Sequence, residues 1–298
     1  MSGAQRIYKN RIKSTQTLKK VFRAMELIAA SRIGKARDRA VGATPYAEAL
    51  TQAVSAVANH THTDHPLTKE RHDTPRVAVL VIAADRGMAG AYTANVLRAT
   101  ERLLEDLDAE GKIVDLFVAG RRGIGYFTFQ DRELAGTWSG ESDSPSTELA
   151  SEIADTLLER FLAARRDGGV SELHVVFTRF KTMVTQTVEV RRMLPLAIVE
   201  GVSEVQESDA LPLYEFEPSA EEVLDALLPL YVRSRIHNAL LHAAASELAS
   251  RQRAMHTATD NAEDLIRNYT RLANSARQAE ITQEISEIVS GADALASS

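Results

Sequence analysis

The sequence contains no cysteine, and this absence excludes several kinds of chemistry at once. Without thiols there is no disulfide, no thiolate nucleophile and no cysteine-ligated zinc. A chain without cysteine also fits a reducing cytosolic setting. We therefore look for function in charge, in apolar patterning and in carboxylate or histidine clusters.

Long apolar runs are lacking as well. The longest, Val77 to Ala84, is far shorter than the roughly 20 residues that a membrane-spanning helix requires. The basic start of the chain has no apolar stretch typical of a secretory signal. With 44% hydrophobic and 26% charged residues, the 298-residue sequence predicts a soluble protein with one large domain, or one domain plus extensions.

Glycine and proline are absent from Leu230 to Ser290, a stretch that lies between Pro229 and Gly291. Its abundant Ala, Leu, Glu, Gln and Arg lose little side-chain freedom in a helix. The stretch predicts one continuous helix roughly 90 Å long, which exceeds the diameter of a domain of this size. We expect most of it to project from its own domain and to need a partner.

This predicted helix carries an apolar seam with the 3,4,3,4 spacing of a left-handed coiled coil. The seam residues are Met255, Ala258, Ala262, Leu265, Tyr269, Leu272, Ala276 and Ala279. Beyond Ala279 the pattern changes to a short apolar end formed by Ile281, Ile285, Ile288 and Val289. Either this end folds back on its own domain, or it marks an interface with another chain, which an exposed apolar patch favours.

A second long helix is predicted from about Ala4 to Ala58, with a kink at Pro45. Its seam consists of Leu18, Phe22, Met25 and Ala29, with Val21 and Ile28 beside them. The simplest way for the two seams to bury each other is an antiparallel coiled coil, in which facing residue numbers sum to about 300. Met1 to Ala40 contains eleven Lys or Arg and two acidic residues, a net charge of +9.

The middle of the chain alternates buried-strand and amphipathic-helix patterns, which predicts a small α/β domain with Rossmann-like order. The predicted strands are Arg76 to Ile82, Ile113 to Val118, Leu173 to Arg179 and an edge strand, Thr187 to Leu196. The predicted helices are Ala91 to Asp108 and Thr147 to Ala164, and the predicted loops are Arg165 to Val170 and Ser203 to Pro212. The fold class is thus α/β, a long antiparallel coiled coil of N- and C-terminal helices plus a central Rossmann-like α/β domain. The expected segments are 1–58 (helix), 59–75 (linker), 76–215 (α/β domain) and 216–298 (helix).

Two glycine-containing segments follow predicted strands, where α/β folds bind ligands: Asp85 to Gly90 and Gly120 to Gly125. The first lacks the Lys-Ser/Thr of a P-loop, and the second has the order G-x-x-G-x-G, the reverse of the dinucleotide fingerprint. We interpret these glycines as turn residues. A nucleotide- or small-molecule-binding α/β protein with helical extensions remains the alternative.

Histidines cluster in the predicted linker. The polar segment contains His60, His62, His65 and His72, with Asp64 and Asp73. Neutral imidazole is a common metal ligand, but this spacing matches no helical pair on a firm element, so a solvated linker is favoured. The other histidines, His174, His237, His242 and His256, are scattered over a strand and the long helix and suggest no site.

Two further alternatives concern partners. The basic N-terminal helix could follow nucleic-acid phosphates, but its stacking aromatics are few, and its apolar face is already committed. A negatively charged protein surface fits better, and no nucleic acid is expected. A free-standing coiled-coil scaffold would self-associate through the seam from Met255 to Ala279.

Both ends of the chain carry specific sequence motifs. At the N-terminal end these are Arg11 to Ser14, Thr17 and Lys20 to Ser31, including the run Ala24-Met25-Glu26-Leu27-Ile28-Ala29-Ala30-Ser31. At the C-terminal end they are Ala254-Met255, Ala258 to Ala262, Arg277 to Ile285 and Glu287 to Ala292. These motifs resemble those of the gamma subunit of bacterial F-type ATP synthases. Asp85-Arg86-Gly87 and its flanks resemble the central motif of that family, so the resemblance covers essentially the whole chain.

The resemblance implies a rotor shaft. The coiled coil would stand inside a hexamer of alternating alpha and beta subunits, and the α/β domain, with the epsilon subunit, would rest on the membrane ring of c subunits. The ATP sites of that family belong to alpha and beta, so no catalytic, cofactor-binding or metal-ligating residue is assigned to this chain. It would be an essential subunit of the proton-transporting ATPase, peripheral on the cytoplasmic face of the bacterial cell membrane and in contact with the membrane only through the complex.

The resemblance also implies candidate contact residues. Met25, Arg277, Gln278, Thr282 and Glu284 match family positions at or beside the rotor-stator contact. Ile281, Ile285, Ile288 and Val289 would lie in an apolar bearing of the hexamer, and the basic N-terminal region suits acidic loops of beta. Ala273 and Ser275 stand where the family often has Tyr and a basic residue, so one stator contact is expected to be missing or supplied elsewhere.

Overall fold

The computed structural model describes residues 3–60, 69–196, 217 and 219–296. The chain divides into two compact units, which we call unit 1 (Met1–Ala30 with Arg251–Ser298) and unit 2 (Ser31–Ser250). Helices α1 (Gly3–His60) and α5 (Ala220–Ala296) contribute residues to both units. The sequence-based division at residues 58, 75 and 215 stays a prediction.

The long helices exceed their predicted ends. α1 continues through Pro45. α5 spans Ala220 to Ala296 and so continues through Pro229 and Gly291, which flank the stretch without glycine and proline. A proline inside a helix costs about 3 kcal/mol, but the residues around Pro229 are held by tertiary packing. Leu224 and Leu228 before it, and Tyr231 after it, are buried in the core of unit 2.

Unit 2 is built on a five-stranded sheet of order β3-β2-β1-β4-β5. The strands are β1 (Arg76–Ile82), β2 (Ile113–Ala119), β3 (Gly136–Trp138), β4 (Glu172–Phe180) and β5 (Gln186–Leu194). The first four are parallel, and β5 pairs antiparallel with β4 at the edge. The four predicted strands are confirmed. β3 was missed because it spans only three residues, one of them glycine.

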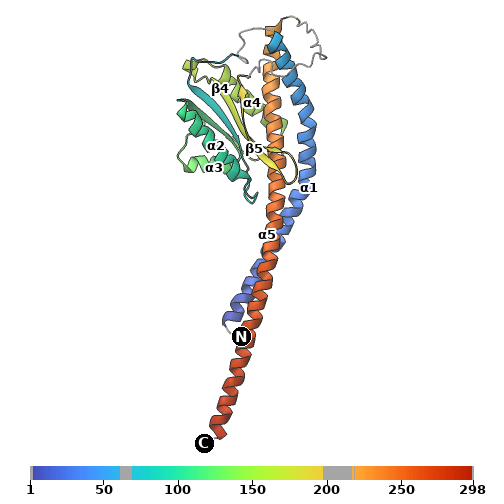
Figure 1. The fold of residues 1–298 in the computed structure, drawn as a ribbon, viewed down its shortest axis with the longest axis vertical. Helices are drawn as coiled ribbons and strands as arrows, with labels where there is room; N and C mark the ends of the chain where they lie inside the picture. Colours follow the sequence, from blue (N-terminus) through green and yellow to red (C-terminus); the bar gives the residue numbers. More distant parts are fainter. Residues whose placement is uncertain (1–2, 61–68, 197–216, 218, 297–298) are drawn as a thin grey trace, which may run out of the picture. The chain divides into compact units, whose positions relative to one another are not determined.

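Helices cover both faces of the sheet (Figure 1). α2 (Tyr92–Ala109) and α3 (Arg121–Phe129) pack on one face, where Val79 of β1 meets Phe127. α4 (Thr147–Leu162) and the unit 2 parts of α1 and α5 pack on the other, where Leu80 meets Leu157 and Ile236. Because both faces are covered, the central strand β1 is apolar at every position from Val77 to Ile82 rather than at alternate ones.

The segment that begins at Gly120 differs from its predicted turn. Gly120 does make the turn, with a φ of 111°, and a Cβ there would lie 2.3 Å from the Ala83 carbonyl oxygen. Gly123 and Gly125, however, lie inside α3. Gly123 lets this helix approach the sheet, since a Cβ would be 2.8 Å from Val118 Cγ1. The low helix propensity of glycine hid α3 from sequence reasoning.

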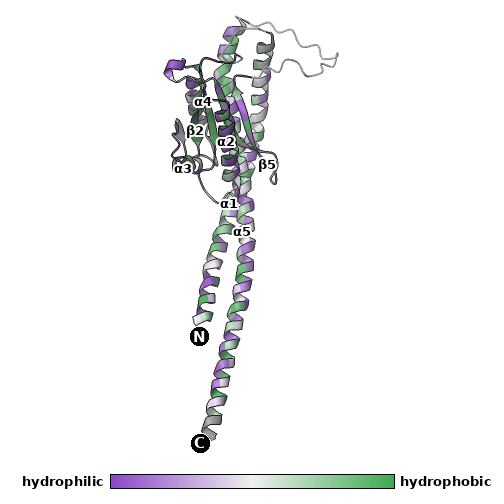
Figure 2. Cartoon of the chain, turned by 60° about the vertical axis from the view of Figure 1, so that its left-hand side comes forward, coloured by the Kyte–Doolittle hydropathy of each residue, from purple (hydrophilic) through white to green (hydrophobic). Residues whose placement is uncertain are grey.

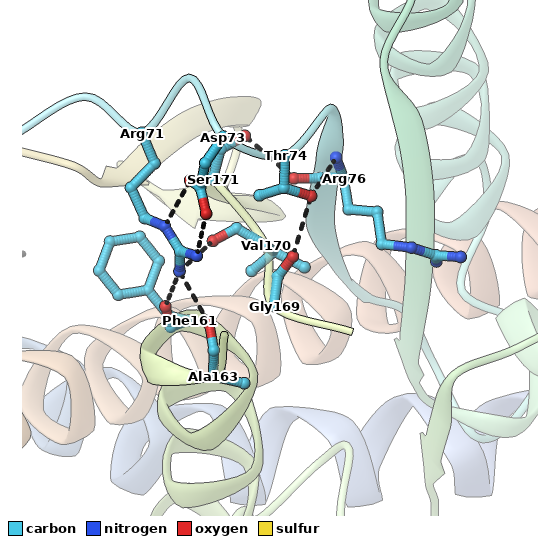
Figure 3. A network of polar contacts seen from close by, with 9 residues as sticks. All are labelled: Arg71, Asp73, Thr74, Arg76, Phe161, Ala163, Gly169, Val170 and Ser171. Carbon is cyan, nitrogen blue, oxygen red and sulfur yellow. Dashed lines mark hydrogen bonds and ion pairs between the residues drawn. The ribbon is translucent and has the colours of Figure 1, made fainter. Parts of the chain in front are cut away.

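Arg71 attaches the segment before β1 to the end of α4 (Figure 3). Its Nη1 donates to the carbonyl oxygens of Phe161, Ala163 and Val170 at 2.8, 3.0 and 3.3 Å. Its Nη2 donates to Asp73 at 3.0 Å, and that hydrogen bond, which outweighs the effect of burial, lowers the pKa of the Asp73 carboxyl. A cation is favourable at the C-terminal end of a helix. The chain therefore enters the sheet from a fixed position.

Unit 1 pairs α1 and α5 in antiparallel orientation. Lys19 forms an ion pair with Glu263, and Glu26 lies 3.2 Å from His256 Nδ1. The residue numbers of both pairs sum to 282, so the predicted sum of about 300 is wrong. The reason is visible in Figure 2, where α5 continues beyond the N-terminus of α1. No residue of α1 therefore faces the last part of α5.

The predicted seam is confirmed in its centre only. Ala29, Met255 and Ala262 are buried. Phe22, Met25, Ala258, Tyr269, Leu272 and Ala276 are partly buried. Leu18, Val21, Ile28, Leu265 and Ala279 are exposed, so their assignment to a buried seam is wrong. Two helices cover only a narrow strip of each other, which leaves the edges of a broad apolar stripe in solvent.

Candidate functional site

The C-terminal end of α5 presents an exposed apolar surface. Ile281, Ile285, Ile288 and Val289 are 44, 56, 72 and 53% exposed. α1 begins at Gly3, so on the observed register it faces α5 only as far as about residue 279. Among the described residues of unit 1, these four side chains have no covering element. Their i, i+4, i+7, i+8 spacing places them on one face of the helix.

The polar candidates on α5 share this face. Arg277, Gln278, Thr282 and Glu284 are all exposed. At 100° per residue, they and the four apolar residues fall within an arc of about 160°. The Thr282 hydroxyl donates to the Gln278 carbonyl oxygen at 2.9 Å, so its own helix already satisfies it. We call this arc, from Arg277 to Val289, the tip surface.

Met25 is not part of the tip surface. It lies half-buried on α1, and the observed register places it opposite about residue 257. Some 20 residues of helix, or roughly 30 Å, separate that level from Arg277. The structure therefore brings together the candidate contact residues on α5. Met25 lies apart from them, at a different height along the helix pair of unit 1.

Next to Met25 lies a polar contact that sequence reasoning missed. The Glu26 side chain, only 11% exposed, accepts a hydrogen bond from Arg23 Nη1 at 2.9 Å and lies 3.2 Å from His256 Nδ1. His256 Nε2 is 3.7 Å from Asp260 on the next turn of α5. The sequence did offer a signal for this contact, because the acidic residue Glu26 lies between the seam positions Met25 and Ala29. The contact joins the two helices at one register.

At the carboxyl ends of the strands, the Asp85 carboxylate is buried and accepts three backbone hydrogen bonds. Arg121 N donates to Oδ1 at 3.0 Å, and Gly140 N and Ser142 N donate to Oδ2 at 2.7 and 3.0 Å. Burial by itself raises the pKa of this carboxyl. The backbone donors and the nearby guanidinium outweigh burial, so the pKa lies below its ordinary value of 3.8. Asp85 thus fastens the ends of β1, β2 and β3 together.

This arrangement bears on the nucleotide-binding alternative. A helix N-terminus is where such folds hold phosphate, but the N-terminus of α3 already binds the Asp85 carboxylate. Beside it lies an open hollow of about 930 Å³ lined by Arg86, Arg98, Arg121 and Arg122. Its rim carries Phe129, which is 90% exposed. The hollow can attract acidic groups, but in the second glycine segment the N-terminus of α3 is already bound to Asp85.

The histidine-rich segment is only partly visible. His62, Asp64 and His65 lie outside the described residues, while His72 is exposed and Asp73 is bound to Arg71. Within residues 3–60, 69–196 and 219–296, no group of three His, Asp or Glu side chains could hold a metal ion. In the same part of the chain, no helix is both long and apolar enough to cross a membrane.

Comparison with known sequences places the chain in a family. The sequence profile of the family described as ATP synthase matches residues 4–295. The ATP synthase gamma chain of Beutenbergia cavernae is 68% identical over 298 residues, which is all of both chains. That of Pseudarthrobacter chlorophenolicus is 59% identical over 99% of this chain and 100% of its own. That of Micrococcus luteus is 55% identical over 98 and 99%, respectively.

Solved structures share the fold. A chain of the Euglena gracilis mitochondrial ATP synthase, in the OSCP/F1/c-ring structure, has a TM-score of 0.66 at 14% identity, covering 98% of this chain and 95% of its own. A chain of the Tetrahymena thermophila central stalk and c-ring has a TM-score of 0.57 at 21% identity, covering 80 and 99%. These distant structures show the fold alone. The family is shown by the relatives, which are more than 50% identical over nearly the full length of the chain. The chain belongs to the ATP synthase gamma chain family.

Proposed function

We propose that this chain, a gamma subunit of the F-type ATP synthase central stalk, is the rotating shaft that couples proton-driven rotation to ATP synthesis and hydrolysis. The catalytic hexamer of alpha and beta subunits would surround unit 1. An asymmetric helix pair offers each beta subunit a different side, and so biases each toward a different nucleotide affinity. Family membership over the full length supports this assignment.

The observation that carries the proposal is the exposed apolar part of the tip surface. Ile281, Ile285, Ile288 and Val289 are at least 44% exposed, which is costly for a helix end in water. An apolar sleeve formed by alpha and beta would cover them without directional bonds. Such a sleeve holds the shaft on its axis while leaving it free to turn, because apolar contact has little orientational preference.

The polar candidates suit transient contacts with the stator. Arg277, Gln278 and Glu284 are exposed on α5. Exposed charge pairs are worth less than about 1 kcal/mol, so the shaft could exchange one partner for the next during rotation. A strong bond in one orientation would instead become a barrier to leaving it. We assign Thr282 to the same surface, with its hydroxyl held by the helix backbone.

Unit 2 would meet the remaining partners. We place the epsilon subunit and the c-subunit ring against it, and the assembled complex on the cytoplasmic face of the bacterial membrane. The chain would reach the membrane only through the complex. The chain similar to ours in Tetrahymena thermophila comes from a structure of a central stalk with its c-ring, which supports the c-ring assignment.

The first test is an affinity pull-down of the tagged chain from its native membranes. We expect two larger subunits in threefold excess over the chain, with ATPase activity in the complex and none in the isolated chain. A chain that is recovered alone and hydrolyses ATP would contradict the shaft assignment. A chain that is recovered alone as a homodimer would favour the scaffold alternative.

Met25→Lys tests the rotor-stator contact. Met25 is half-buried, and a lysine there would extend its ammonium group from the seam to an acidic stator group. The new charge-assisted bond should lower the number of protons pumped per ATP hydrolysed. Met25→Leu, which conserves volume and adds no charge, is the matched control and should behave as the wild type. Unchanged coupling in Met25→Lys would remove Met25 from the contact surface.

The alternative of a nucleotide-binding protein would rest on the hollow lined by Arg86, Arg98, Arg121 and Arg122. Four guanidinium groups at the carboxyl edge of a parallel sheet could bind a nucleotide. Calorimetric titration of the isolated chain with ATP would reveal stoichiometric binding, and Arg122→Ala should then abolish it. We expect no binding, because Asp85 already occupies the N-terminus of α3.

A further inference from the structure

The loop of residues 139–146, between β3 and α4, contacts two other parts of unit 2 at once. On one side, Gly140 N and Ser142 N donate to the Asp85 carboxylate, and the Ser142 hydroxyl accepts from Asp85 N at 2.9 Å. At its end, the Ser146 hydroxyl caps α4 by accepting from Leu149 N at 3.1 Å. The loop is thus fixed both to the strand ends and to a helix.

The other side of the loop contacts α1. Arg32 Nη1 lies 2.5 Å from Asp143 Oδ2, and Arg39 Nη1 donates to the Ser144 hydroxyl at 3.2 Å. Arg32 and Arg39 are seven residues apart, so they lie on the same face of the helix two turns from each other. The Asp143 side chain is 19% exposed, which places its carboxylate against the helix rather than in open solvent.

α5 is also held to the same sheet. Phe180, at the end of β4, packs with Ile33, Ala36, Leu248 and Ala249 in one buried cluster. The Ser246 hydroxyl, also buried, donates to the Thr178 carbonyl oxygen at 3.1 Å. Apolar contact thus holds both helices to the end of β4, α5 through Leu248 and Ala249 and α1 through Ile33 and Ala36. α1 has the charged contacts with the loop in addition.

We propose that the loop of residues 139–146 is a mechanical link, which passes torque between α1 and the sheet through the Arg32–Asp143 pair and the Asp85 hydrogen bonds. The inference rests on the proposed shaft function, because torque passes through this link only if the chain turns as part of the central stalk. Arg32, Asp143 and Asp85 are positioning residues in this link. They contact neither substrate nor nucleotide.

The arrangement suits this role for two reasons. Each contact involves at least one charged group or a backbone amide with a fixed direction, so it resists sideways displacement in a way that apolar contact does not. The contacts also lie in series, because Ser142 binds Asp85 while the next residue, Asp143, binds Arg32. A displacement of α1 would reach the ends of β1, β2 and β3 through this short stretch of backbone.

The test uses charge reversal in the whole complex, reconstituted in vesicles. Arg32→Asp and Asp143→Arg each break the pair, and the double variant restores it with the charges exchanged. Arg37→Asp is the matched control, because Arg37 lies on the same helix and its ion pair is with the adjacent Asp38. For each complex we would measure two quantities. The first is the ATPase activity in the presence of an uncoupler, when no proton gradient opposes rotation. The second is the stalling gradient, which is the largest proton gradient that ATP-driven pumping reaches.

We expect each single variant to keep its uncoupled ATPase activity and to stall at a smaller proton gradient, and the double variant to recover. In the free chain, amide exchange of residues 139–146 should rise about two- to fivefold in the single variants, the range that corresponds to an exposed ion pair. Ser144→Ala removes only the hydroxyl contact of Arg39 and should give the same changes in weaker form, without risk to folding.

Faster exchange with an unchanged stalling gradient would overturn the proposal, since the pair would then only order the loop. A double variant that stalls as early as the singles would overturn it as well. A wild-type chain that recovers no ATPase partners would instead overturn the proposed function. The exchange experiment and the pull-down therefore separate the two failures.

Discussion

Units 1 and 2 bury their apolar side chains to very different degrees. In unit 2, both faces of the sheet are covered, and Leu80, Phe117 and Ile236 are fully buried. In unit 1, the buried apolar residues among those described are Ala29, Met255, Ala262 and Ala273. About half of the exposed large apolar side chains described lie in unit 1, which is roughly a quarter of the chain.

The difference separates a unit that encloses its own core from a unit that leaves much of its apolar surface exposed. A sheet with helices on both faces encloses its own core. A pair of helices cannot, and leaves residues such as Leu27 and Ile285 more than half exposed. Exposed apolar surface of this kind marks an interface, which agrees with a shaft enclosed by other subunits. Four predictions test this contrast, in order of decreasing effect on stability.

Leu80→Ala should destabilise unit 2 by about 3 kcal/mol, because it leaves a cavity in a closed core. Trp138, the only tryptophan, stacks 6.2 Å from Phe117 in this unit, so its fluorescence in a urea titration reports the unfolding of unit 2. Leu265→Ala in unit 1, where the side chain is 45% exposed, is the control and should cost less than about 1 kcal/mol. Equal losses of stability in the two variants would contradict the difference in burial between unit 2 and unit 1.

Asp85→Asn should cost about 2 kcal/mol, because an amide cannot accept all three backbone hydrogen bonds of the carboxylate. The pKa of Asp85 is lowered in the folded chain, so its contribution is present above the ordinary value of 3.8 and is lost as the pH falls below it. The variant should therefore show a flatter loss of stability below about pH 4. The free energy of unfolding can be measured at each pH by Trp138 fluorescence. If it falls with pH in the variant as it does in the wild type, the acid sensitivity belongs to other groups.

Glu26→Ala and His256→Ala should each weaken unit 1 slightly. His256 is 62% exposed, so solvent screening limits the coupling between the two side chains to about 0.5 kcal/mol. A double-mutant cycle, followed by far-UV circular dichroism during thermal unfolding, isolates this coupling energy. A value of zero would mean that the contact between Glu26 and His256 does not help to set the register of the two helices.

Replacing Ile281, Ile285 and Ile288 together by Gln should change the stability of the isolated chain by no more than about 0.5 kcal/mol, since the side chains are exposed. The same change should reduce recovery of alpha and beta in the pull-down. Ser286→Gln with Ser290→Gln, on the opposite face of this helix end, is the control and should assemble normally. Normal assembly of the triple variant would show that the tip surface needs no apolar cover.

Sequence reasoning succeeded where a pattern is local. Val, Ile and Leu runs located the strands, and β1 was predicted from Arg76 to Ile82, its observed bounds. It failed where glycine or short length hid an element, as in α3 and β3. The candidate residues on α5 were named from family resemblance, and the structure adds that they share one exposed face. Asp85 was singled out only as part of a turn, because its hydrogen-bond partners are 36 to 57 residues away.

Composition and periodicity by themselves determined the absence of thiol chemistry, the helical nature of both ends and the α/β alternation of the middle. These properties depend on each residue and its near neighbours. The tertiary structure alone decided that α5 continues through Pro229, that facing residues in unit 1 sum to 282, and that Asp85 joins three strand ends. Each of these results comes from packing or hydrogen bonding between distant segments, whose free energy outweighs local propensity.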